Sequence, residues 1–185
     1  LECTKDGKLV GHLTLGRGAL DSIRLHVDPT TTNILLLGTN LLARSLALEL
    51  TLSGTLGITI ADPWDGQAAL LADAVNAIEG GRATVVEDKL PPTCDSVDIV
   101  IATEEVRPFP PNFQLPELRE DLVVVDTSLD PKASPIIKAA TAANSCQVDG
   151  LEVTTATMAI NFRSLTGIEP DTEALREALD EFLDY

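Results

Sequence analysis

The sequence predicts an α/β domain built on a doubly wound parallel sheet with helices on both faces. Short runs of leucine and β-branched residues recur along the chain, and segments of helical periodicity separate them, as in sheets whose strands are buried on both faces. The first such run, at 34–37, ends at Gly38 and leads into a helical segment, which is how a βαβ unit begins. A strand order of 3-2-1-4-5-6 is therefore expected.

Strands and helices are expected to alternate along the chain. The expected strands are 9–15, 34–37, 57–61, 82–86, 97–102, 122–126 and 146–149. The expected helices are 16–25, 39–50, 65–78, 134–143, 151–165 and 171–183. A turn at 5–8 and a polar loop at 29–32 precede the first strand of the sheet, and a proline-rich loop follows residue 102.

Three of these helices show which side should face the core. The predicted buried sets are Leu20, Ile23 and Val27; then Leu70, Leu71, Ala74 and Ile78; and finally Leu175, Leu179 and Phe182. Gly80 and Gly81 are expected to end the second of these helices through a positive φ. Asp171 is placed to cap the last one.

Composition limits the classes of partner. The formal charge of −16 repels phosphate backbones and anionic membranes, so nucleic acid and membrane partners are not expected. The cysteines Cys3, Cys94 and Cys146 are far apart and lack metal-ligand spacing, which indicates reduced thiols, a cytoplasmic protein and no metal. His12 and His26 have no acid or cysteine partner evident in sequence, so no catalytic role is assigned to them.

The turn after the first strand is a candidate phosphate site. The dinucleotide fingerprint G-x-G-x-x-G/A of Rossmann-like folds is represented by Gly38-Thr39-Asn40-Leu41-Leu42-Ala43, which keeps the first glycine and has alanine in the third position. Asn40 tolerates a left-handed backbone, whereas Leu41 brings bulk to the helix start. Thr39 either donates to a phosphate or caps the helix. Both a binding turn and a plain structural turn remain open.

Residues after the next strands extend this candidate site. Asp62 lies about 24 positions after Gly38, where a carboxylate accepts from a ribose diol and repels a 2′-phosphate, so NAD is favoured over NADP. Its alternative role is to cap the following helix. Trp64 either stacks on adenine or packs at the helix start. Glu104 and Glu105 either line the crevice or are solvated loop acids.

The whole chain resembles one family in order. Residues 6–16 (DGKLVGHLTLG) resemble the segment D-G-K-L-V-G-x-N-T-D-G of shikimate dehydrogenases, and 34–38 with Ala43 and Arg44 resemble I-L-L-L-G-A-G-G-A-A-R. Further matches lie at 98–103 (D-L-V-I-N-A-T), 126–135 (D-x-x-Y-N-P-x-x-T-P) and 149–167 (D-G-L-G-M-L-x-x-Q…F…W-T-G). The resemblance covers the C-terminal NAD(P)-binding domain of that family and implies its fold.

The departures from the family pattern fall on its reacting groups. Leu13 and Leu15 occupy the positions of the asparagine and the catalytic aspartate, and Thr157 that of the substrate-contacting glutamine. Leu129 and Asp130 replace the Y-N of Y-N-P, and the asparagine of I-N-A-T is either deleted or replaced by Ala102. Thr103 and Gly150, which the resemblance places near the nicotinamide pocket, are retained. No catalytic residue is therefore assigned in this chain.

Two functions follow from the resemblance. In the first, residues 1–185 are the dinucleotide-binding domain of a longer shikimate-pathway protein of aromatic amino acid biosynthesis, an oxidoreductase whose catalysis is impaired here. Segments 1–24 and 151–185 would then link to and close against a substrate domain. In the second, the chain is a pseudoenzyme that serves as a scaffold, dimerisation or regulatory domain. A homodimer is an open alternative.

Overall fold

The computed structural model describes residues 2–64, 66–86, 92–103, 110, 113–129 and 134–183. Its centre is a six-stranded, fully parallel sheet in the order β5-β4-β3-β6-β7-β8. The strands are β3 (Asn33–Leu37), β4 (Gly57–Ala61), β5 (Ala83–Val85), β6 (Ile99–Ala102), β7 (Val123–Asp126) and β8 (Cys146–Val148). In chain order this is 3-2-1-4-5-6, so the predicted fold class and strand order are confirmed.

Helices cover both faces of the sheet. The helices are α1 (Leu15–Arg24), α2 (Leu41–Ser53), α3 (Ala68–Asn76), α4 (Pro135–Ala143), α5 (Gly150–Thr166) and α6 (Thr172–Leu183), with a short 3₁₀ helix η1 (Pro29–Thr31) before β3. One core cluster joins a sheet face to buried residues of α1, α2, α3 and α5. The other joins the opposite face to α4 and to apolar residues of the loop before β7.

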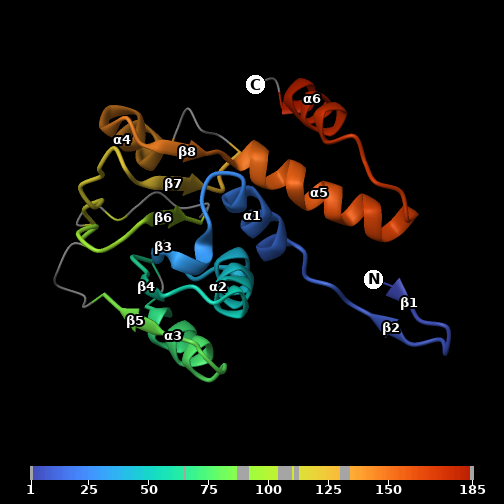
Figure 1. The fold of residues 1–185 in the computed structure, drawn as a ribbon, viewed down its shortest axis with the longest axis horizontal. Coiled ribbons are helices and arrows are strands. Elements are labelled where there is room, and N and C mark those ends of the chain that lie inside the picture. Colours follow the sequence, from blue (N-terminus) through green and yellow to red (C-terminus); the bar gives the residue numbers. More distant parts are fainter. Residues whose placement is uncertain are drawn as a thin grey trace.

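The two ends of the chain lie outside this sandwich. The short strands β1 (Glu2–Cys3) and β2 (Leu9–Val10) form an antiparallel hairpin that stands apart from the sheet (Figure 1). Helix α5 extends past the edge of the sheet, and α6 packs mainly against α5. No helix in the described part of the chain is both long and apolar enough to cross a membrane.

The packing of α1 and the cap of α6 confirm two sequence predictions. Leu20 and Ile23 are fully buried, and Val27 packs against the same cluster. Asp171 Oδ1 accepts the backbone N–H groups of Glu173 and Ala174 at 3.0 and 3.1 Å, which satisfies two donors at the start of α6.

The predicted strand at 9–15 is wrong. Only Leu9 and Val10 pair, and α1 already begins at Leu15. Leu9 and Val10 are exposed and the hairpin stands apart from the sheet, so packing does not enforce a strand through the residues that follow.

The predicted faces of α3 and α6 are wrong in part. In α3 the buried residues are Ala68, Leu71, Ala72 and Val75, so Leu71 is confirmed, while Leu70 is exposed. Both stripes are apolar at helical spacing, so the sequence did not separate them. The helix ends at Asn76, before Gly80 with its φ of +82°, and Asp65 lies outside the described residues. In α6 no residue is buried, and Phe182 is 83% exposed.

Candidate functional site

Gly38 makes the tight turn between β3 and α2. Its φ is +106°, a conformation that glycine adopts without steric cost, and its N–H donates to the Ala61 carbonyl at 2.8 Å. A Cβ at this position would lie 2.4 Å from Thr103 Oγ1. The Thr103 hydroxyl itself donates to the Leu37 carbonyl at 2.9 Å. The structure therefore brings together two predicted site residues, Gly38 and Thr103, at the carboxyl ends of β3 and β6.

Asn40 caps α2. Its Oδ1 accepts the Ala43 N–H at 2.9 Å, and its φ is −64°, so the left-handed tolerance considered for Asn40 is not used. The alternative that Thr39 caps the helix is wrong. Its hydroxyl donates instead to Asp62 Oδ2 at 2.7 Å, and its carbonyl accepts from Arg44 Nε at 2.9 Å. Leu41 is the first helical residue and is 60% exposed.

Asp62 joins the end of β4 to the turn after β3. Besides the Thr39 hydroxyl, its carboxylate accepts the Trp64 N–H at 3.0 Å and the Gln67 N–H at 2.8 Å. Gln67 is the N-cap residue of α3, so Asp62 does stabilise the segment leading into the following helix. Thr39, Asp62 and Trp64 are thus neighbours at one corner of the carboxyl edge. A role of Asp62 toward ribose, and of Trp64 toward adenine, stays a prediction.

Gly150 lies further along the same edge. It is the first residue of α5, and a Cβ there would lie 2.1 Å from the Ser128 carbonyl oxygen. The loop after β7 is linked to β6 by the Thr127 N–H, which donates to the Ala102 carbonyl at 3.1 Å. Gly150 therefore neighbours the loop after β7 rather than Gly38.

Asp126, the last residue of β7, is a buried acid that sequence reasoning treated only as part of a motif. It is 4% exposed, and Oδ1 accepts the Ser128 N–H at 3.0 Å. Among the described residues Oδ2 has no hydrogen-bond partner. Burial raises the pKa of this carboxyl, and the Ser134 hydroxyl and the Ser128 N–H oppose that rise. In the sequence, the signal for this buried acid was an aspartate at the end of an apolar strand.

The positions matched to the family's reacting groups lie where α1 meets α5. Leu15 begins α1 and is half-buried, and Leu13 before it is 50% exposed. Thr157 of α5 is buried, and a Cβ on Gly18 would lie 2.0 Å from its Oγ1. Gly18 is one turn after Leu15, so both matched positions belong to one helix contact. Leu129 is half-buried; Glu104, Glu105 and Asp130 lie outside the described residues.

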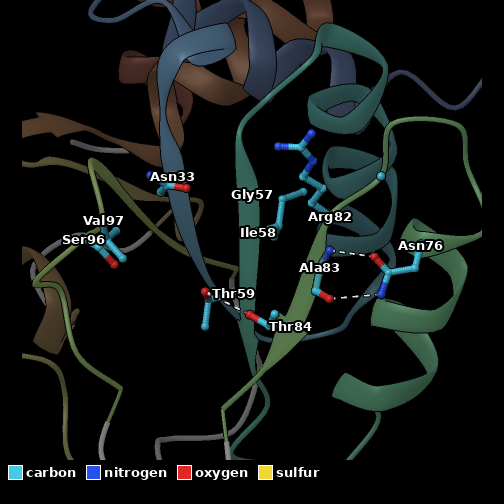
Figure 2. Close-up of a pocket in the computed structure, with 11 residues that line it drawn as sticks. Asn33, Gly57, Ile58, Thr59, Asn76, Arg82, Ala83, Thr84, Ser96 and Val97 are labelled. Atoms are coloured by element: carbon cyan, nitrogen blue, oxygen red, sulfur yellow. Dashed lines mark hydrogen bonds between the residues drawn. The ribbon is translucent and has the colours of Figure 1, made fainter.

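The pocket drawn in Figure 2 lies at the opposite end of the strands from Gly38 and Asp62. It has a volume of about 440 Å³ and is lined by residues at and beside the starts of β3, β4 and β5, including Asn33, Gly57 and Arg82. The Asn76 side chain forms one wall by bonding both backbone groups of Ala83, at 3.0 and 2.7 Å. Because Gly38 and Asp62 follow the carboxyl ends of their strands, this pocket does not contain the predicted site.

Sequence reasoning missed one cluster altogether. His26 Nε2 lies 2.9 Å from Glu152 Oε1, and His26 Nδ1 lies 3.5 Å from Cys146 Sγ. The separations along the chain, 126 and 120 residues, left no local signal. Within the described ranges, no group of three or more His, Cys, Asp or Glu is arranged to hold a metal ion.

The fold and the turn after β3 define the chain as a Rossmann-like domain of dinucleotide-binding type. No protein-family profile matches it. It is 28% identical over 183 residues to the NADP⁺ shikimate dehydrogenase of Methanocaldococcus jannaschii and 27% identical over 187 residues to that of Methanopyrus kandleri. These alignments cover 95% and 96% of the chain but 64% of each relative.

Solved structures agree with this similarity. The chain matches ligand-free 5-ketofructose reductase of Gluconobacter sp. with a TM-score of 0.85 and 26% identity, covering 96% of this chain and 66% of that one. It matches a shikimate dehydrogenase in complex with NADP⁺ with a TM-score of 0.72 and 27% identity, covering 97% and 64%. The chain is thus similar to the C-terminal NAD(P)-binding region of shikimate dehydrogenases, and it spans about two thirds of the length of these relatives.

Proposed function

We propose that this chain is the NAD-binding domain of a longer, shikimate dehydrogenase-like protein and that its own catalytic positions are impaired. The observation that carries the proposal is the corner formed by Gly38, Thr39 and Asp62, where the turn after β3 meets the carboxylate after β4 at 2.7 Å. In open α/β sheets, ligands bind outside the carboxyl ends of the strands, and a carboxylate on the second strand suits the ribose of NAD.

The residues of this corner fit a dinucleotide in three respects. Gly38 adopts the positive φ of the tight turn with which the dinucleotide fingerprint begins. The start of α2 directs backbone N–H groups and the positive end of the helix dipole toward the same place. The exposed Leu41 side chain can turn toward solvent rather than fill the phosphate position. NAD, when bound, would supply the hydride acceptor.

Asp62 is the residue that would select NAD. A ribose hydroxyl would take the place of the Thr39 hydroxyl on Oδ2, while Trp64 and Gln67 keep their N–H bonds to the carboxylate. A 2′-phosphate at this point would meet the carboxylate's negative charge within a few ångströms. This repulsion is the basis for preferring NAD over NADP.

Catalysis is proposed to be impaired because aliphatic side chains replace a proton acceptor. Hydride transfer between nicotinamide and 3-dehydroshikimate or shikimate also requires a proton to move at the reacting oxygen. Leu15 and Leu13, at the start of α1, offer no side-chain atom that accepts a proton or a hydrogen bond. Thr157 is buried, and its hydroxyl already donates to the Val153 carbonyl at 2.9 Å.

An apolar surface at the chain ends supports a contact with a further domain. The exposed apolar side chains on and between the last two helices are Met158, Phe162, Leu165, Ile168 and Phe182. Surfaces of this kind are usually covered by another domain or subunit. We therefore propose that segments 1–24 and 151–185 link to and close against a substrate domain in a cytoplasmic protein.

The second candidate is a scaffold or regulatory domain that binds no nucleotide, with the same apolar surface serving as a contact for its own chain or for a second copy. It is favoured by the internal bonding of the turn, since Asn40 bonds Ala43 and Thr39 bonds Asp62. A turn whose polar groups are already satisfied holds its conformation without a ligand.

Calorimetric titration of the folded chain with NAD and with NADP separates the two candidates. Micromolar binding of NAD and at least tenfold weaker binding of NADP are expected. In Asp62→Asn the preference for NAD should fall by about tenfold, equivalent to about 1.4 kcal/mol. Glu79→Gln, which removes the same charge at an exposed residue after α3, should leave the preference unchanged. Absence of binding for both nucleotides would support the scaffold, and tighter binding of NADP would contradict the role of Asp62.

A further inference from the structure

Three side chains from distant parts of the sequence form a cluster in which the middle one contacts the other two. His26 follows the end of α1, Cys146 begins β8, and Glu152 lies in the first turn of α5. The imidazole stands between the other two, with Nδ1 3.5 Å from Cys146 Sγ and Nε2 2.9 Å from Glu152 Oε1. A thiol, an imidazole and a carboxylate that contact one another in this order are the parts of an activated cysteine nucleophile.

The backbone holds each member in place. The His26 N–H donates to the Ile23 carbonyl at 3.0 Å, and the Cys146 N–H donates to the Leu122 carbonyl at 3.1 Å. The Glu152 N–H donates to Asp149 Oδ1 at 2.7 Å, which caps α5. The fold therefore sets the backbone position of each of the three residues.

The two contacts of the imidazole fix the direction in which a proton can move. Glu152 accepts, so Nε2 carries the hydrogen and Nδ1 presents a lone pair toward the thiol. A proton that leaves Cys146 for Nδ1 creates an imidazolium whose charge faces the Glu152 carboxylate. In a chain of net charge −16, this local cation is what a thiolate needs for stabilisation.

Cys146 differs from the buried Cys94 in its exposure to solvent. Cys146 is exposed, and the His26 side chain is 27% exposed. Cys94 is 4% exposed, and burial raises the pKa of its thiol to about 11, so Cys94 is an internal reference of low reactivity. The cluster includes none of the residues at the Gly38 turn, so it does not depend on the proposed NAD binding.

We propose that Cys146, together with His26 and Glu152, is a nucleophilic cysteine site that forms mixed disulfides with low-molecular-weight disulfides. The Cys146 proton passes to His26 Nδ1, and the sulfur attacks one sulfur of the disulfide. A new S–S bond forms as the original S–S bond breaks, and the leaving thiolate takes the proton from His26. The protein thiol is oxidised to a mixed disulfide, and the other half of the reagent leaves as a thiol.

Timed reaction of the folded protein with iodoacetamide and with 2-hydroxyethyl disulfide tests this site. Both reagents are uncharged, so the protein's net charge does not bias them. Mass spectrometry of the peptides gives a separate rate for each cysteine. Cys146 should react at least about threefold faster than the same cysteine in a synthetic peptide of residues 143–150, because His26 Nδ1 stands 3.5 Å from the sulfur and can take the thiol proton as the sulfur attacks. Cys94 should not react in the folded chain.

Variants assign the effect to the cluster. His26→Gln should return Cys146 to the peptide rate or below, and Glu152→Gln should lower the rate by about half or more. His12→Gln, which changes the other histidine, should leave the rate unchanged. A wild-type Cys146 no faster than the peptide overturns the proposal without any variant. A rate in His26→Gln equal to that of the wild type overturns it as well.

Discussion

Gly38 should be among the residues at the carboxyl edge that tolerate substitution least. Gly38→Ala tests this through the free energy of unfolding. A left-handed backbone costs a non-glycine residue about 1–2 kcal/mol. The added methyl would lie 2.4 Å from Thr103 Oγ1, and overpacking of this kind costs about 1–3 kcal/mol more. The expected loss in the free energy of unfolding is therefore about 2–5 kcal/mol, measured by urea denaturation.

A matched glycine separates the two contributions. Gly54, the C-cap residue of α2, has a φ of +88° and nothing within 4 Å of an added Cβ. Gly54→Ala should then lose only the backbone cost of about 1–2 kcal/mol. Any gain from a stiffer unfolded chain is common to both substitutions, so it cancels in the comparison.

Thr103→Ala tests the contact itself. It removes the hydroxyl that the new methyl would meet, along with the bond to the Leu37 carbonyl, and alone should lose about 1 kcal/mol. Combined with Gly38→Ala it should recover most of the overpacking cost, as a double-mutant coupling of about 1–3 kcal/mol. Equal losses for Gly38→Ala and Gly54→Ala would refute the reasoning. Zero coupling between Gly38→Ala and Thr103→Ala would refute it as well.

Three further changes probe the same edge. Asn40→Ala removes the α2 cap and should cost about 1 kcal/mol by urea denaturation, whereas no loss would show that the cap is dispensable. Gly150→Ala places a methyl 2.1 Å from the Ser128 carbonyl and should cost about 2–3 kcal/mol; a neutral effect would mean that the loop yields. Burial raises the pKa of Asp126 above 3.8, so its contribution to stability is present below that pH and is lost as pH rises through the folded-state pKa. The stability of Asp126→Asn relative to wild type should therefore improve between about pH 3 and about pH 7, and a constant difference would contradict the shift.

The sheet was predictable from sequence because its strands β3, β6 and β7 are built on compact apolar runs. The run at 34–37 is fully buried, as a parallel strand covered on both faces must be. The glycine turns and intervening helices then fix the order of strands, since crossovers in such sheets share one hand. The predictions of a strand at 9–15 and of a buried stripe on α6 were wrong because alternation and helical spacing do not specify what covers a face.

The site was predictable only in part. Gly38, Thr39 and Asp62 follow strands that lie side by side, so their meeting follows from strand order. The sequence could not show that Thr39 bonds Asp62 while Asn40 takes over the cap, because both side chains are short hydrogen-bonding groups near a helix start. The cluster of His26 with Cys146 and Glu152 depends on packing between elements far apart in the chain, and no periodicity encodes it.

The two glycines predicted to line the site each have a packing reason that does not involve a nucleotide. Gly38 accommodates Thr103, and Gly150 accommodates the Ser128 carbonyl. Their presence therefore reports the fold, and evidence for binding has to come from side chains whose contacts a ligand would change. The Thr39 hydroxyl on Asp62 Oδ2 is such a contact.

Thr39→Val distinguishes the ways in which this corner can bind NAD. If a ribose hydroxyl replaces Thr39 on Asp62, the variant removes the competing donor, and NAD affinity in calorimetry should rise about fivefold, or about 1 kcal/mol. If Thr39 instead donates to a phosphate, the same change lowers affinity. Stability should fall by about 1–2 kcal/mol in either case, because a hydrogen bond to a charged group is lost. A fall in affinity would therefore refute the assignment of Asp62 to the ribose and leave the turn itself as the binding element.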